Sequence, residues 1–300
     1  MAWDFIKSLL VFLIIIFAFV LLLLLPREME ITHHGGLVFT ADFPFTFDLY
    51  KEKIAAFVEH FRMEKGFGNN SMGVPILEEV QKLLLRDFTI IVPALLLSMG
   101  AGTLLGIVQF YFRDKIIGKV QAFFSWIFSS IPDFFLFIAL QYLLIKLFYI
   151  GVPKFSLYGN DHWYNFLIPM IAITVFPMVH MVKFTSAALE NEMGQDYLRT
   201  ARSKGLTTLN ILKHMIWNCL YSILNQTQFV MLYLLTSLPI MQKLASFQGA
   251  GYHLLTSIQE FDEPRALAFM LPYLLMMFAT IVLSKLLKYK LLPQKAGALQ

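Results

Sequence analysis

A polar, cationic stretch interrupts the apolar second half of the chain, and its residue types are suited to binding a partner protein. It reads MGQDYLRTARSKGL, from Met193 to Leu206. In the helix that it predicts, acidic residues lie toward the N-terminal half and Arg and Lys toward the end, as the helix dipole favours. Arg and aromatic side chains supply much of the energy of protein interfaces. Two hypotheses remain open: a docking site for a cytoplasmic partner, and an amphipathic helix that lies on lipid.

We expect this helix to extend from about Ala187 to Lys204, with Ser186 as its N-cap. Gly205 stands where a left-handed residue would end it. A second helical run is predicted from around Thr208. The helical spacing predicts a single apolar stripe made of Leu189, Met193, Tyr197 and Ala201. The expected geometry is a short helix, a sharp glycine turn and a return into an apolar segment.

Polar residues inside the apolar segments are the second group with chemical potential, because they are costly in lipid and often face a cavity or a partner. Asp133 follows Pro132, which is expected to kink or interrupt its helix. Asp133 either pairs with a nearby donor or lies close enough to an interface to be hydrated, or it lines a pathway and attracts a cationic group such as a peptide amine. Four further polar residues follow helical spacing and are expected either to line a pathway or to form hydrogen bonds between helices: Asn218, Ser222, Asn225 and Gln226.

No motif for catalysis, nucleotide binding or metal binding accompanies these residues. The sequence has no G-x-x-x-x-G-K-[ST] phosphate loop and no H-E-x-x-H, and its histidines lack metal-ligand spacing. We therefore predict no catalytic residue, no metal and no cofactor bound by this chain. The net charge of +4 gives no case for nucleic-acid binding, and the single Cys219 cannot form an internal disulfide.

The composition predicts an all-α polytopic membrane protein. Hydrophobic residues make up 58% of the chain and charged residues 15%, against roughly a quarter charged in soluble domains. A membrane helix needs about 20 mostly apolar residues. Gly102 and Gly106 in the second segment predict close helix packing. Six spans are expected, at about Phe5–Leu25, Phe88–Phe112, Val120–Phe148, Tyr164–Phe184, Met215–Ile240 and Ala266–Leu287.

Charge in the short loops predicts the orientation. Most of their Lys and Arg fall on one side, so both termini and the cationic helix are expected in the cytoplasm. In the long outer loop, an amphipathic helix is expected, capped by Asp48 and ended by Gly66, with its aromatic face packed on the chain itself or on a partner. The expected organisation is an N-terminal span (1–26), an extracytoplasmic loop (27–87), a transmembrane domain (88–290) with a cytoplasmic loop (185–214), and a cytoplasmic tail (291–300).

The segment ENEMGQDYLRTARSKGLTTLNILKHMIWNCL resembles the cytoplasmic signature loop of ABC-importer permeases of the dipeptide, oligopeptide and nickel subfamily. Further similar stretches are GTLLG, SSIPDFF and ASFQGAGYHLLTSIQEFDEPRAL. Three features depart from that family's pattern. PREME stands where P-G-D-P is usual, Asp133 stands where a serine is usual, and Gln242 or Lys243 stands where an acidic residue is common.

The resemblance implies a MetI-like permease core preceded by an extra N-terminal span, in the bacterial cytoplasmic membrane. It implies a second permease subunit (usually a different chain), two ABC ATPase subunits that use ATP and Mg²⁺, and an extracytoplasmic solute-binding protein. The cargo would be peptides, or nickel or other metal chelates. The residues that would couple to the ATPase are Gly194, Asp196, Tyr197, Leu198, Arg199, Ala201, Arg202, Lys204 and Gly205.

Two other classes of function remain as alternatives. The missing P-G-D-P and the missing acidic residue at Gln242 or Lys243 are compatible with an exporter or sensor subunit. Such a subunit would work with an ATPase and without a solute-binding protein. A membrane enzyme would need a nucleophile and a base at matching depth, and the sequence offers no such pair.

Overall fold

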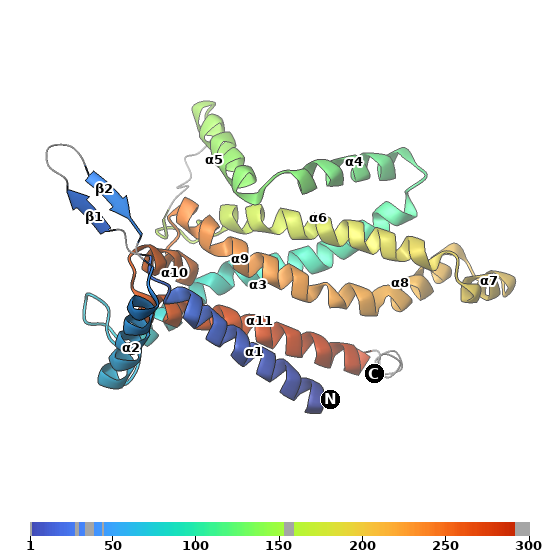
Figure 1. The fold of residues 1–300 in the computed structure, drawn as a ribbon. Coiled ribbons are helices and arrows are strands. Elements are labelled where there is room, and N and C mark those ends of the chain that lie inside the picture. The colour runs from blue at the N-terminus through green and yellow to red at the C-terminus, as the bar shows by residue number, and fades with distance from the viewer. Residues whose placement is uncertain (1, 28–29, 34–38, 44, 153–158, 292–300) are drawn as a thin grey trace. The chain divides into compact units, whose positions relative to one another are not determined.

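The computed structural model describes residues 2–27, 30–33, 39–43, 45–152 and 159–291 (Figure 1). The predicted tail therefore lies outside the described residues, except for Leu291. Two strands pair as an antiparallel hairpin, β1 (Glu30–His33) and β2 (Phe39–Asp42). The helices are α1 (Ala2–Leu23), α2 (Phe47–Glu64), α3 (Ile76–Tyr111), α4 (Ile116–Ser130), α5 (Asp133–Tyr149), α6 (Leu167–Glu192), α7 (Asp196–Ser203), α8 (Thr208–Asn225), α9 (Thr227–Ala245), α10 (Ala250–Gln259) and α11 (Glu263–Leu291).

Four helices in the described part of the chain are long and apolar enough to cross a membrane: α1, α3, α6 and α11. The polytopic, predominantly helical fold is confirmed. Helix α3 begins at Ile76, well before the expected start at Phe88, and α6 continues to Glu192, past the expected end at Phe184. The hairpin β1–β2 is a small addition to the all-α expectation.

The other two expected spans are broken helices, and the number of spans reaches six only if each bent pair counts as one. The expected span Val120–Phe148 falls on α4 and α5, which meet at a bend of 103°. Pro132, directly before α5, produces the predicted interruption, because proline disfavours a helical conformation in the residue before it. The expected span Met215–Ile240 falls on α8 and α9, and that run bends by 82° before α10.

The chain divides into two compact units, of which the first comprises Met1–Leu84 and His253–Leu275. Its core is built on Leu23, Ala266 and Leu267, and the half-buried Phe57 and Phe61 of α2 pack against them. The outer-loop helix therefore packs on the chain's own scaffold, which was one of the two predicted partners for its aromatic face. Both predicted ends of this helix are wrong, however. The hydroxyl of Thr46, rather than Asp48, accepts the Leu49 N–H at the start, and Lys65, rather than Gly66, takes the left-handed conformation at the end.

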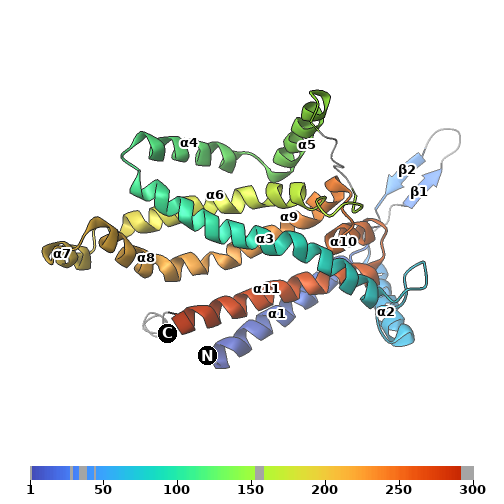
Figure 2. The ribbon, with the colours of Figure 1, turned by 180° about the vertical axis from the view of Figure 1, so that it is seen from behind.

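The second unit comprises Leu85–Tyr252 and Met276–Gln300. Helix α6 contacts α4, α5, α8 and α9. Figure 2, which is seen from behind, shows α3 crossing in front of α6. A Cβ at Gly102 would lie 2.6 Å from Met181 Cβ, and one at Gly106 would lie 2.7 Å from the Val182 carbonyl oxygen. The predicted close packing at Gly102 and Gly106 is confirmed, because only glycine lets α3 approach α6 this closely.

Candidate functional site

The cationic helix is α7, and it is shorter than expected because the preceding helix does not stop at Ser186. Ser186 is buried inside α6, so it is not an N-cap. The residues after it, Ala187 to Glu190, are good helix formers, and α6 continues until Gly194 separates it from α7. The expected single stripe is consequently divided: Leu189 belongs to α6, whereas Tyr197 and Ala201 belong to α7.

The turn after α7 has the geometry that the sequence predicted. Gly205 adopts φ +74°, its N–H donates to the Arg202 carbonyl at 2.9 Å, and the Leu206 N–H donates to the Ala201 carbonyl at 3.2 Å. These two bonds form a Schellman motif, which satisfies carbonyls that a helix end otherwise leaves free. Helix α8 then begins at Thr208, as predicted. The turn fixes the angle between α7 and α8.

The N-terminal end of α7 is tied to the end of α6 by a hydrogen bond across Gly194. The Tyr197 hydroxyl donates to Glu192 Oε2 at 2.5 Å. Burial, together with this bond, raises the pKa of Tyr197 to about 12, so the phenol stays protonated and remains a donor. Tyr197 also hydrogen-bonds Asn218 on α8. Tyr197 thus connects three consecutive helices.

The exposed side of α7 carries its positive charges. The side chains of Arg199, Arg202 and Lys204 are exposed, and Arg199 makes an ion pair of 3.3 Å with Asp196, which is itself exposed. Leu198 was expected among the residues that couple to the ATPase, but it is only 1% exposed and packs inside the chain. Leu198 therefore positions α7, and Tyr197 is half-buried. The surface available to a partner is mainly cationic.

Asp133, in the first turn of α5, has a close donor in the second unit. Its Oδ2 accepts a hydrogen bond of 3.0 Å from the Tyr233 hydroxyl of α9, and its Oδ1 accepts the Phe134 N–H at 2.8 Å. The Tyr233 ring stacks on Phe176 of α6, with centroids 4.6 Å apart. Asp133 is therefore paired with a nearby donor, and because it is only half-buried its carboxylate also stays accessible to a pathway.

Three of the other predicted pathway residues bond to residues of other helices. The Asn225 side chain accepts from Lys288 of α11, and Gln226 Oε1 lies 3.1 Å from His180 Nε2 of α6. These two contacts join helices, as one of the two hypotheses expected. Asn218 bonds Tyr197, and Ser222 is exposed.

Sequence reasoning missed the most buried acidic site of the second unit. Asp87 of α3 is 0% exposed, and its Oδ1 accepts from Gln242 Nε2 at 2.6 Å and from the Ala250 N–H at 3.0 Å. Its Oδ2 accepts the Gly251 N–H at 3.3 Å, so the carboxylate sits at the N-terminus of α10, where the helix dipole favours negative charge.

Gln242 completes this arrangement, since its Oε1 accepts the Tyr252 N–H at 2.9 Å. The only signal for Asp87 in the sequence is an acid at the edge of an apolar run, and its partners lie more than 150 residues further along the chain.

In the ranges that the structure describes, no group of three or more His, Cys, Asp and Glu side chains is arranged to hold a metal ion.

Comparison with known proteins decides the class to which this arrangement belongs. Residues 98–295, about two thirds of the chain, match the family described as binding-protein-dependent transport system inner membrane component. The chain belongs to this family. Members of the binding-protein-dependent transport family are transport subunits, and the ABC-importer resemblance of the signature loop is confirmed at this level. The match includes α7 and its glycine turn, whereas α1, the hairpin and α2 precede it.

Curated relatives within the family include glutathione transport system permease proteins GsiC. Those of Escherichia coli strain K12 and Salmonella choleraesuis are 24% identical to this chain over 191 residues, and that of Pectobacterium atrosepticum is 25% identical. Each alignment covers 63% of this chain. The chain spans 61% of the length of these relatives.

Proposed function

We propose that this chain is a permease subunit of an ATP-driven importer and that α7 is its coupling helix. The observation that carries the proposal is an exposed cationic helix whose two ends are both fixed, by the Tyr197–Glu192 bond and by the Schellman turn at Gly205. A rigidly held helix transmits a displacement to α8, whereas a flexible joint would absorb it. An ATPase subunit that closes on ATP would displace α7 and so tilt the membrane helices between inward- and outward-facing states.

The family description supports the proposed partners. Permeases of binding-protein-dependent systems work with ATPases and a solute-binding protein. For this chain we propose two ABC ATPase subunits on α7 and its counterpart, a second permease subunit that is a different chain, and a solute-binding protein outside. ATP and Mg²⁺ would be used by the ATPases, and this chain would bind no cofactor. The proposed orientation places both termini in the cytoplasm.

The proposed cargo is a peptide, with nickel or another metal chelate as the alternative. Support comes from the relatives named as glutathione permeases, since glutathione is itself a small peptide. Asp133 is the proposed contact for the cargo's amine, because it is a half-buried carboxylate at the break between α4 and α5. Two of its hydrogen-bond donors, the Phe134 N–H and the Tyr233 hydroxyl, are neutral.

Site-specific photo-cross-linking in native membranes tests the coupling proposal. A photoreactive residue placed at Arg202 should cross-link to an ATP-binding subunit, which mass spectrometry would identify. The same residue at the exposed Met72 of the outer loop is the matched control and should give no such product. Cross-links from both positions, or from neither, would contradict the proposed place of α7.

Replacement of Asp133 by asparagine tests the cargo contact. If the carboxylate attracts a cationic amine, Asp133→Asn should raise the KM for peptide uptake by about tenfold, the equivalent of about 1.4 kcal/mol. ATP hydrolysis by the assembled complex should be unchanged. Tyr233→Phe, which removes the donor but keeps the carboxylate, is the control and should leave that KM within about twofold. Unchanged uptake kinetics in Asp133→Asn would remove Asp133 from the pathway.

A further inference from the structure

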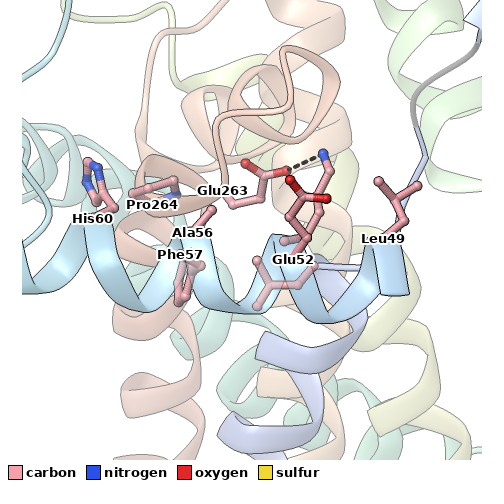
Figure 3. Close-up of a pocket in the computed structure, with 9 residues that line it drawn as sticks. Leu49, Glu52, Ala56, Phe57, His60, Glu263 and Pro264 are labelled. Carbon is pink, nitrogen blue, oxygen red and sulfur yellow. Dashed lines mark ion pairs between the residues drawn. The ribbon is translucent and has the colours of Figure 1, made fainter. Parts of the chain in front are cut away.

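A cavity of about 480 Å³ lies along α2 in the first unit, and α2 precedes the region that matches the family, whereas Glu263 and Pro264 of its lining fall within that region. It is lined by Leu24, Leu49, Glu52, Lys53, Ala56, Phe57, His60, Glu263 and Pro264. Figure 3 shows α2 running along this cavity, with His60 at one end, Leu49 at the other, and Glu263 and Glu52 close together between them. The coupling and cargo proposals above make no use of this cavity.

Two helices that are long and apolar enough to cross a membrane end beside the cavity, which places it at the depth of their ends. Leu24 directly follows the last residue of α1, and Glu263 and Pro264 are the first two residues of α11. The Tyr50 hydroxyl of α2 donates to the Leu21 carbonyl at 2.7 Å, which fixes α2 against the end of α1. Lipid head groups occupy this depth, just outside the hydrocarbon core.

Aromatic side chains beside the cavity support this depth. Phe43, Phe45 and Phe47 are 67%, 52% and 74% exposed. The Phe45 ring lies 6.0 Å from the Phe47 ring and 6.3 Å from the Tyr50 ring, measured between centroids. Trp and Tyr are the aromatic residues typical of the membrane–water interface, and Tyr50 lies at the end of α1, where its hydroxyl bonds to Leu21.

The cavity combines opposite charges with an apolar wall. Lys53 Nζ forms an ion pair of 3.9 Å with Glu263 Oε1, and the Glu52 carboxylate projects beside them (Figure 3). Both carboxylates can accept from a ligand's ammonium, and the Lys53 ammonium can donate to a phosphate. The remaining wall is mostly apolar, formed by Leu24, Leu49, Ala56, Phe57 and Pro264.

We propose that this cavity binds the head group of a zwitterionic phospholipid with a primary ammonium, of the phosphatidylethanolamine type. The ammonium donates to Glu52 and Glu263, the phosphate accepts from Lys53, and the acyl chains lie along the exposed apolar side of α1, which includes Phe19 and Leu22. A quaternary ammonium has no N–H to donate, so phosphatidylcholine should bind more weakly. In the proposed orientation this lipid belongs to the outer leaflet.

Native mass spectrometry of the full chain, purified with any accompanying subunits, tests this site. The protein is exchanged into equal amounts of phosphatidylethanolamine and phosphatidylcholine with identical acyl chains, and the retained lipids are counted. The parent should retain phosphatidylethanolamine with a preference of about tenfold, and Glu52→Gln should reduce that preference at least about threefold. Glu59→Gln removes the same charge from an exposed position of α2 outside the cavity and should change nothing.

Three results would overturn the proposal. The first is equal retention of the two lipids by the parent. The second is equal loss of preference in Glu52→Gln and Glu59→Gln, which would show a non-specific charge effect. The third is displacement of the retained lipid by a millimolar dipeptide that is itself retained, which would make this a peptide site. The Glu52 side chain is exposed, so Glu52→Gln should keep the parent's melting temperature. The experiment measures lipid binding, so its result is independent of whether the chain imports peptides.

Discussion

Replacement of Gly249 by alanine should destabilise the second unit by about 3–5 kcal/mol, the cost of disrupting a buried charge and its partners. A Cβ at this position would lie 2.1 Å from Asp87 Oδ1 and 2.4 Å from Gln242 Nε2. Both atoms are held in buried hydrogen bonds, so neither can move without leaving a donor or the carboxylate unsatisfied. Thermal unfolding of the purified chain, followed as loss of monodisperse protein in detergent, measures the effect.

Gly66→Ala is the control for this variant. A Cβ at Gly66 would meet no atom within 4 Å, and its φ is not in the left-handed region. Gly66→Ala should therefore change the stability by less than about 0.5 kcal/mol, as for most surface substitutions. Equal stability of Gly249→Ala and the parent would show that Asp87 and Gln242 do not form the rigid site described above.

Gly106→Ala should separate α3 from α6 and lower the stability by about 1–3 kcal/mol, the usual cost of overpacking. The new Cβ would lie 2.7 Å from the Val182 carbonyl oxygen, which is backbone and cannot rotate away, and 2.6 Å from Thr185 Cβ. The unfolding assay used for Gly249→Ala applies here.

Gly100→Ala is a matched control on the same helix. A Cβ at Gly100 would meet nothing within 4 Å, and alanine favours a helix over glycine by up to about 1 kcal/mol. Gly100→Ala should be neutral or stabilising. If Gly100→Ala and Gly106→Ala behaved alike, the loss at Gly106 would reflect the helix itself and not its contact with α6.

Local signals in the sequence predicted the elements whose geometry is set locally. Gly205 ends α7 because only glycine adopts φ +74° without strain, and Gly102 with Gly106 marks a helix contact by spacing alone. Pro132 predicted the break between α4 and α5 for the same kind of reason.

The wrong or missing predictions concern residues whose environment is set by contacts with parts of the chain that are distant in sequence. Ser186 resembles an N-cap, but burial of its side chain inside α6 overrides that preference. Leu198 resembles an interface anchor, and only the fold shows that it faces inward. Asp87 gave almost no signal, because its partners Gln242, Ala250 and Gly251 come together only in the folded chain.

The central claim is that α7 passes the ATPase stroke to the membrane helices, and ATP-driven uptake by the reconstituted transporter tests it most directly. Arg199, Arg202 and Lys204 are exposed, so their joint replacement by alanine should leave the permease folded. A few residues, often Arg, supply most of the binding energy of an interface, and each such hot spot contributes about 2 kcal/mol or more. The account predicts that uptake falls at least about tenfold while the variant permease still assembles in the membrane. Uptake at the parent's rate by that variant would contradict it.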